Sequence, residues 1–133
     1  MKERVTHPST ELATIEHVDG GWITFVDPSR YPKARFGETK PYYAPYSLDS
    51  LRGPDSGVIK LPQSVYWGPD RRFNLSHRSA LREVYQMVLQ EGTIEDIIEY
   101  LDSSVLLSLW NDLMLPPRVT HLWEQKVLGA QSG

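Results

Sequence analysis

Residues 76–101, SHRSALREVYQMVLQEGTIEDIIEYL, repeat their apolar side chains at helical spacing. The first apolar set falls at positions i, i+3, i+4, i+7 and i+8: Leu81, Val84, Tyr85, Val88 and Leu89. This stripe predicts an amphipathic helix from about 77 to 90. Ser76 is the expected N-cap, and Gly92 is expected to close the helix in a left-handed conformation.

Three further helices are expected after Gly92. Thr93 and Asp96 have the spacing of a capping box, and the helix after Thr93 has an apolar face made of Ile94, Ile97, Ile98 and Leu101. A third, short helix is predicted from Val105, Leu106, Leu109 and Trp110. Pro117 suits the first turn of a fourth helix that carries Leu122 and Trp123.

The first half of the chain favours strands. Asp19-Gly20-Gly21 is a turn signal between residues 12–18 and 22–26, which we interpret as a hairpin. Val65-Tyr66-Trp67 is predicted as a strand, with a turn at 68–71 and a returning strand over 72–75. All four tryptophans are expected in the core: Trp22, Trp67, Trp110 and Trp123.

Residues 28–57 are rich in proline and tyrosine, with prolines at 28, 32, 41, 45 and 54. Proline cannot donate to a sheet, so no central strand is expected there. A helical turn is predicted around Ser47–Arg52. The whole pattern predicts an α+β fold with one domain over 1–128. A small antiparallel sheet from residues 12–75 would be covered on one face by four helices from 76–128, before a flexible tail at 129–133.

Composition excludes several classes of function. The 133 residues include no cysteine, so disulfides, thiol nucleophiles and cysteine zinc sites are excluded. Residues 1–75 hold ten Lys/Arg and nine Asp/Glu, net +1, whereas residues 76–133 hold four and eight, net −4. An acidic helical half is a poor reader of a phosphate backbone. No membrane span or signal peptide is expected, which predicts a cytoplasmic protein.

Residues 30–43 interleave four basic residues with four aromatic ones. Arg and Tyr are favoured at protein interfaces, so the expected contact residues are Arg30, Tyr31, Arg35, Tyr42 and Tyr43. The same composition also suits stacking of single-stranded bases, or an ordinary loop with half-buried tyrosines. A second candidate surface is the acidic face Glu95, Glu99 and Asp102, which is otherwise a solvated helix face.

Catalytic and metal patterns are incomplete. His17 has Glu16 and Asp19 nearby in sequence, but a strand points Glu16 and His17 to opposite faces. Asp55 and Lys60 resemble part of a nuclease pattern, yet Val58 stands where its second acid belongs. No histidine pair has the spacing of a helical zinc site. We therefore predict no catalytic set, no metal and no cofactor.

Residues 61–124 carry a family resemblance. Its marks are the segments Leu61–Trp67, Phe73–Leu75, Val84–Ile97, Leu109-Trp110, Leu115–Val119 and Trp123-Glu124. In this order they resemble a group of short, uncharacterised actinobacterial proteins, often encoded beside nucleotidyltransferase-like toxins of the abortive-infection type. The resemblance implies an antitoxin-like accessory protein that binds such a toxin.

Three functional hypotheses follow. The first is a non-enzymatic, antitoxin-like protein-binding module that occludes a partner. The second is a DNA-binding regulator whose helical half contains a helix-turn-helix, against which the acidic charge of that half argues. The third is a small hydrolase or nuclease that uses His17 with Asp19 or Asp55.

Overall fold

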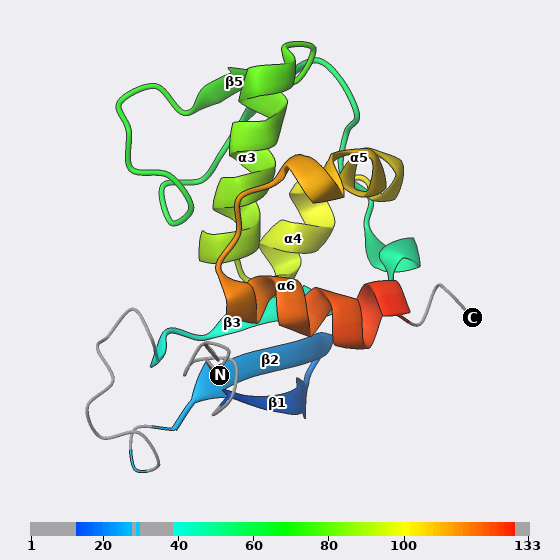
Figure 1. The fold of residues 1–133 in the computed structure, drawn as a ribbon. Coiled ribbons are helices and arrows are strands. Elements are labelled where there is room, and N and C mark those ends of the chain that lie inside the picture. The colour runs from blue at the N-terminus through cyan, green and yellow to red at the C-terminus, as the bar shows by residue number, and fades with distance from the viewer. Residues whose placement is uncertain (1–12, 28, 30–38, 130–133) are drawn as a thin grey trace, which may run out of the picture.

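The computed structural model describes residues 13–27, 29 and 39–129. It confirms the α+β fold, with a small antiparallel sheet followed by four helices (Figure 1). Strands β1 (Ala13–Val18) and β2 (Gly21–Val26) form the predicted hairpin, paired from Ala13↔Val26 to Val18↔Gly21. Gly20 has φ 93°, the left-handed conformation that the tight turn requires.

A third strand, β3 (Tyr42–Pro45), pairs antiparallel with β2 and completes the order β1-β2-β3. It lies within the proline-rich segment in which we expected no central strand, and it is an edge strand with Pro45 at its end, where proline is tolerated. Gly21 permits the close approach of β3, because a Cβ there would stand 2.1 Å from the Ala44 carbonyl oxygen. The predicted helical turn is confirmed as η1 (Leu48–Ser50).

Strands β4 (Val58–Lys60) and β5 (Arg72–Asn74) form a second, two-stranded sheet. The single sheet expected over 12–75 is therefore two sheets. The prediction of a strand at Val65-Tyr66-Trp67 is wrong. The Pro62 carbonyl accepts hydrogen bonds from the Val65 and Tyr66 amides at 3.0 and 3.1 Å, which turns the chain, and β5 pairs with β4 instead.

The four predicted helices are α3 (Arg78–Glu91), α4 (Ile94–Tyr100), α5 (Ser103–Leu109) and α6 (Pro117–Trp123). A short 3-10 turn, η2 (Trp110–Asp112), follows α5, and α6 continues into a π-helical segment, Glu124–Leu128. None of the helices in the described ranges is both long and apolar enough to cross a bilayer.

The ends of α3 and α4 agree only in part with the sequence-based expectation. The capping box is confirmed, since Thr93 Oγ1 accepts from the Asp96 amide and Asp96 Oδ2 accepts from the Thr93 amide. Ser76 is not the N-cap of α3; His77 is, and its side chain makes no cap hydrogen bond. Gly92 is not left-handed, because its φ is −85°. Glycine is needed there for space instead, since a Cβ would lie 2.7 Å from the Val88 carbonyl oxygen.

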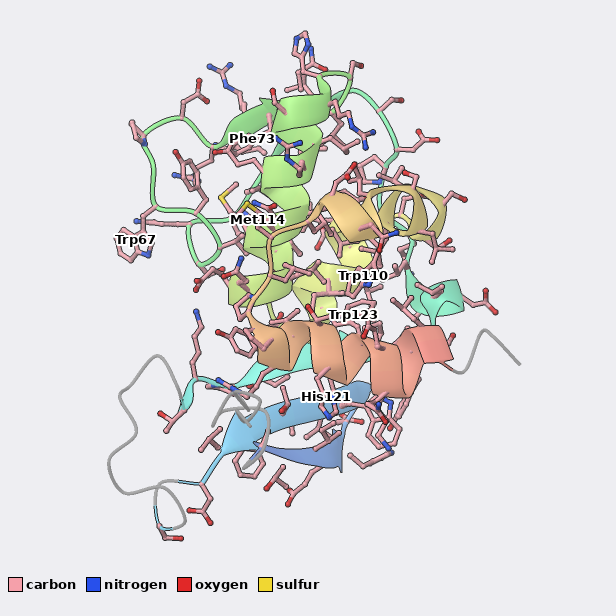
Figure 2. The ribbon with its side chains drawn as sticks, in the orientation of Figure 1. Trp67, Phe73, Trp110, Met114, His121 and Trp123 are labelled. Atoms are coloured by element: carbon pink, nitrogen blue, oxygen red, sulfur yellow. The ribbon has the colours of Figure 1, made fainter. Side chains whose placement is uncertain are left out.

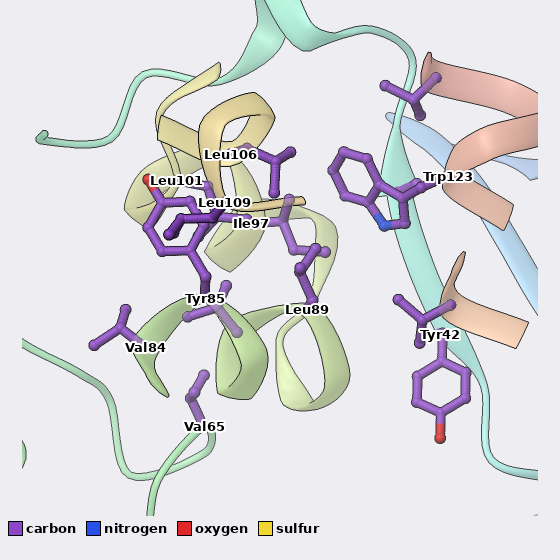
Figure 3. Packing of buried hydrophobic residues seen from close by; sticks show 14 of the residues in the cluster. Tyr42, Val65, Val84, Tyr85, Leu89, Ile97, Leu101, Leu106, Leu109 and Trp123 are labelled. Atoms are coloured by element: carbon purple, nitrogen blue, oxygen red, sulfur yellow. The ribbon is translucent and has the colours of Figure 1, made fainter. Parts of the chain in front are cut away.

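The core lies among the helices, one face of the three-stranded sheet and the segment around β4 and β5, which contributes Leu61, Val65 and Leu75. Helix α6 lies along that face against β2 and β3, while α3, α4 and α5 stack beyond it (Figure 1). Trp123 points from α6 toward Leu106 and Leu89, and Tyr85 lies beside Leu101 (Figure 3). Burial raises the pKa of Tyr85 to about 12, and its hydroxyl oxygen accepts a hydrogen bond from the Asp102 amide at 2.8 Å.

Arg118 joins α6 to the sheet. Its side chain is 2% exposed, and its guanidinium donates to the carbonyl oxygens of Thr24 and Lys40. The guanidinium carbon stands 4.6 Å from the centre of the Tyr42 ring, a cation–π arrangement. Burial lowers the Arg118 pKa from its ordinary value. Backbone carbonyls and an aromatic face thus stabilise this buried charge.

Candidate partner-binding site

A depression of about 270 Å³ lies where the β1–β2 turn, β3 and the start of α4 meet. Its lining residues are Val18, Asp19, Tyr43, Thr93, Ile94 and Glu95. The volume falls below the roughly 300–1,000 Å³ of most small-molecule pockets. The depression therefore suits a single side chain better than a cofactor.

Local structure explains how these residues come together. The turn at Gly20 places Asp19 beside the start of α4, since a Cβ at Gly20 would lie 3.5 Å from Ile94 Cγ2. Alternation along β3 separates the two tyrosines, so that Tyr42 is buried and Tyr43 is half-buried at the depression. The capping box at Thr93 starts α4 and places Glu95 in its first turn.

The depression is acidic and partly apolar. Asp19 and Glu95 are both exposed carboxylates, and no Lys, Arg or His is among the lining residues. Val18, Ile94 and the Tyr43 ring supply apolar surface beside them. Such a surface can accept a cationic side chain, whose aliphatic stem contacts apolar groups while its charged end meets the carboxylates.

Two of the predicted contact residues, Tyr43 and Glu95, lie together in this depression. Glu99 is exposed on α4 but does not line it. Asp102 caps α5, where its carboxylate accepts from the Val105 amide at 3.0 Å. Tyr42 is 7% exposed beneath Arg118 and Lys40, so its ring belongs to the core and is not available for a surface contact. The remaining three lie outside the described residues: Arg30, Tyr31 and Arg35.

No family model, curated protein or solved structure matches the chain. The candidate site therefore rests on its own geometry.

Sequence reasoning missed Asp19 as a member of this site. In the sequence, Asp19 stands out only as a carboxylate near His17. The Asp-Gly-Gly turn held a usable signal, because a hairpin turn packed against a helix start brings its acid close to the first-turn acid of that helix. The sequence contains no signal for the pairing of β3 with β2, which brings Tyr43 into the depression beside Asp19 and Glu95.

The histidine considered for catalysis has a different neighbourhood. His17 is exposed and shares a hydrogen bond between its Nε2 and the Tyr46 hydroxyl. Its ring meets Trp22 edge-on, with centroids 5.6 Å apart. Asp55 is exposed in the loop before β4. Across the described residues, no three or more His, Cys, Asp or Glu side chains are grouped so as to hold a metal.

Proposed function

We propose that this chain is a non-enzymatic protein-binding module whose acidic depression receives a basic side chain of its partner. The observation that carries the proposal is that Tyr43, Glu95 and Asp19 line one depression although they come from β3, α4 and the β1–β2 turn. Exposed acids on separate elements are ordinary, but here two of them lie beside a half-buried tyrosine in one depression, which we call the acidic recess.

The chemistry of the recess favours arginine or lysine. A carboxylate forms charge-assisted hydrogen bonds with either cation, and arginine can engage it with two parallel N–H groups. The tyrosine ring adds a face on which a guanidinium can stack. Glu95 also lies in the first turn of α4, where the helix dipole stabilises a negative charge in the free protein.

The antitoxin-like role belongs to the same proposal and is supported by the family resemblance of residues 61–124. On that view the partner is a nucleotidyltransferase-type toxin, and binding covers a surface that the toxin needs. The recess then supplies the contact, while the helical core holds its three contributing elements in place.

The test is co-expression of the tagged chain with the proteins encoded beside it, followed by size-exclusion chromatography and titration calorimetry on any complex. Glu95→Lys and Tyr43→Ala should each weaken the complex at least tenfold, since charge reversal repels the basic side chain and truncation removes its stacking face. Glu83→Lys is the matched control, because Glu83 is an exposed acid on α3 outside the recess.

Unfolding curves of each variant separate binding from stability. A complex that survives Glu95→Lys and Tyr43→Ala, or one that Glu83→Lys weakens equally, contradicts the recess as the contact. The absence of any stoichiometric complex with the neighbouring proteins contradicts the antitoxin-like role.

A further inference from the structure

The β4–β5 hairpin exposes an aromatic ring on an ordered loop. Trp67 is 78% exposed and projects from the edge of the molecule (Figure 2), which overturns the expectation that it belongs to the core. The loop around it is fixed by the burial of Leu61 and Val65. The Leu61 amide donates to the Arg71 carbonyl at 2.9 Å, and Arg71 Nε donates to the Leu61 carbonyl at 3.0 Å. Trp67 is therefore held outward by a structured loop.

The same hairpin has an open, basic depression of about 400 Å³, lined by Lys60, Pro69, Asp70, Arg71 and Arg72. Its single acid is already engaged, since Asp70 Oδ1 accepts from Arg72 Nε at 3.1 Å and from the Arg72 amide at 3.1 Å. These bonds hold the pKa of the Asp70 carboxyl below its usual value. The Lys60 charge also lowers the pKa of the Asp70 carboxyl, although Lys60 makes no ion pair within the described residues. Three cations against one carboxylate leave the depression with an excess of positive charge.

We propose that the β4–β5 hairpin binds single-stranded nucleic acid, with a base stacked on Trp67 and phosphates held by Lys60, Arg71 and Arg72. The hairpin carries both an exposed indole and a basic depression, and this combination recognises single strands without sequence preference. Cationic side chains and an exposed aromatic ring occur together on this hairpin. A duplex offers no free base face, so it would engage the cations alone.

The surroundings of Trp67 favour a base over an acidic protein segment. A tryptophan at the centre of a protein interface is surrounded by contacts that exclude water. Here the neighbours along the loop include Gln63, Ser64 and Asp70, all exposed and polar. Stacking on a base needs only one open face of the ring, which Trp67 offers.

The net charge of −3 on the whole chain does not prevent an anionic strand from binding at this hairpin. The excess of acids lies in residues 76–133, whereas the hairpin belongs to the half of the chain with net +1. Three phosphate contacts predict a modest salt dependence for a single strand, with log K falling by roughly 2 per decade of salt. Binding is therefore expected at low ionic strength and is independent of the acidic recess.

The test is fluorescence anisotropy of a short labelled oligothymidine titrated with the full chain at low salt. Trp67→Ala should weaken binding about tenfold or more, Trp67→Phe should retain most of it, and Lys60→Glu should weaken it and flatten the salt dependence. Matched controls are Met114→Ala, which truncates another residue that is 80% exposed, and Arg52→Glu, an exposed charge reversal outside the depression. Glu95→Lys should leave oligothymidine binding undiminished, which separates this site from the recess.

Three results with nucleic acid would overturn the proposal. They are no binding by the wild-type chain at low salt, binding that Trp67→Ala leaves unchanged, and equal, Trp67-independent binding of a duplex of matched length. Polyglutamate serves as the competitor that represents an acidic protein. If it displaces oligothymidine at equal charge concentration and itself binds in a Trp67-dependent manner, the hairpin recognises an acidic polypeptide instead.

Discussion

Trp123 and Trp67 were both expected in the core, and the structure places them at opposite extremes. Trp123 on α6 is 0% exposed and packs among residues of the other helices, whereas Trp67 in the β4–β5 loop is 78% exposed (Figures 2 and 3). The two side chains are chemically identical. Their environments differ because one lies on a helix with a repeated apolar face and the other in a connection with no repeat.

The difference shows where an apolar pattern carries information about burial. In α3 the stripe at helical spacing places Val84, Tyr85, Val88 and Leu89 all in the core. Strands β4 and β5 have three residues each, too few to establish an alternation. Trp67 is followed by Gly68 and Pro69, which favour a turn. Because Trp67 lies in a loop, no helix or strand face directs its ring toward the core.

The largest expected effect tests this contrast directly. Trp123→Ala should lower the free energy of unfolding by about 3–5 kcal/mol, because it empties a large, fully buried volume. Trp67→Ala should change it by about 0.5 kcal/mol or less, as at most exposed positions. Urea unfolding followed by circular dichroism measures both. Similar losses for the two variants would mean that Trp67 supports the fold, and the hairpin would then need a different explanation.

A smaller effect concerns the polar link inside the helical core. The Tyr85 pKa is raised to about 12 by burial, while in the unfolded chain it is near 10. Below pH 10 the Tyr85 hydroxyl keeps its proton in both the folded and the unfolded state, so its contribution to the free energy of unfolding is fully present. Between pH 10 and 12 the unfolded state loses its proton first, so the free energy of unfolding should fall by roughly 2–3 kcal/mol. Burial also raises the Tyr100 pKa, which acts in the same direction.

Tyr85→Phe is the control for that titration. The variant loses the acceptor of the Asp102 amide, so it should be less stable at neutral pH by about 1–3 kcal/mol. It should also lose most of the decline between pH 10 and 12. Unfolding curves of wild type and variant across that range give the comparison. An equal decline in both would assign the alkaline effect to other groups.

Much of the fold could be predicted from the sequence because its signals are local. The Asp-Gly-Gly turn, the capping box at Thr93 and the proline that starts α6 each act within a few residues. Features that depend on distant partners could not be predicted in this way. Strand β3, which the sequence did not indicate, pairs with the open edge of β2. The strand predicted at Val65-Tyr66-Trp67 is wrong, because β5 pairs with β4 and these three residues lie in the connecting loop.

The candidate site follows the same rule. Tyr43 and Glu95 were predicted as contacts from two unrelated features, an aromatic segment and an acidic helix face. Their meeting in one recess depends on the register Ile23↔Tyr43 and on the packing of the Gly20 turn against Ile94. No spacing along the chain encodes those contacts. Tyr42 and Asp102 do not line the recess. Tyr42 is buried in the core, and the Asp102 side chain caps α5.

The smallest expected changes in the free energy of unfolding concern the N-caps of two helices, α3 and α4. Thr93 caps α4 with its side chain, and His77 stands at the start of α3 without a side-chain cap, although both have extended backbones. Thr93→Ala should cost about 1 kcal/mol of stability, and His77→Ser should add up to about 1 kcal/mol, because serine can accept the hydrogen bond that histidine leaves unmade. Urea midpoints of the two variants measure both changes. If His77→Ser does not stabilise the chain, the start of α3 is fixed by other contacts, such as the 2.6 Å ion pair between Arg78 and Asp112.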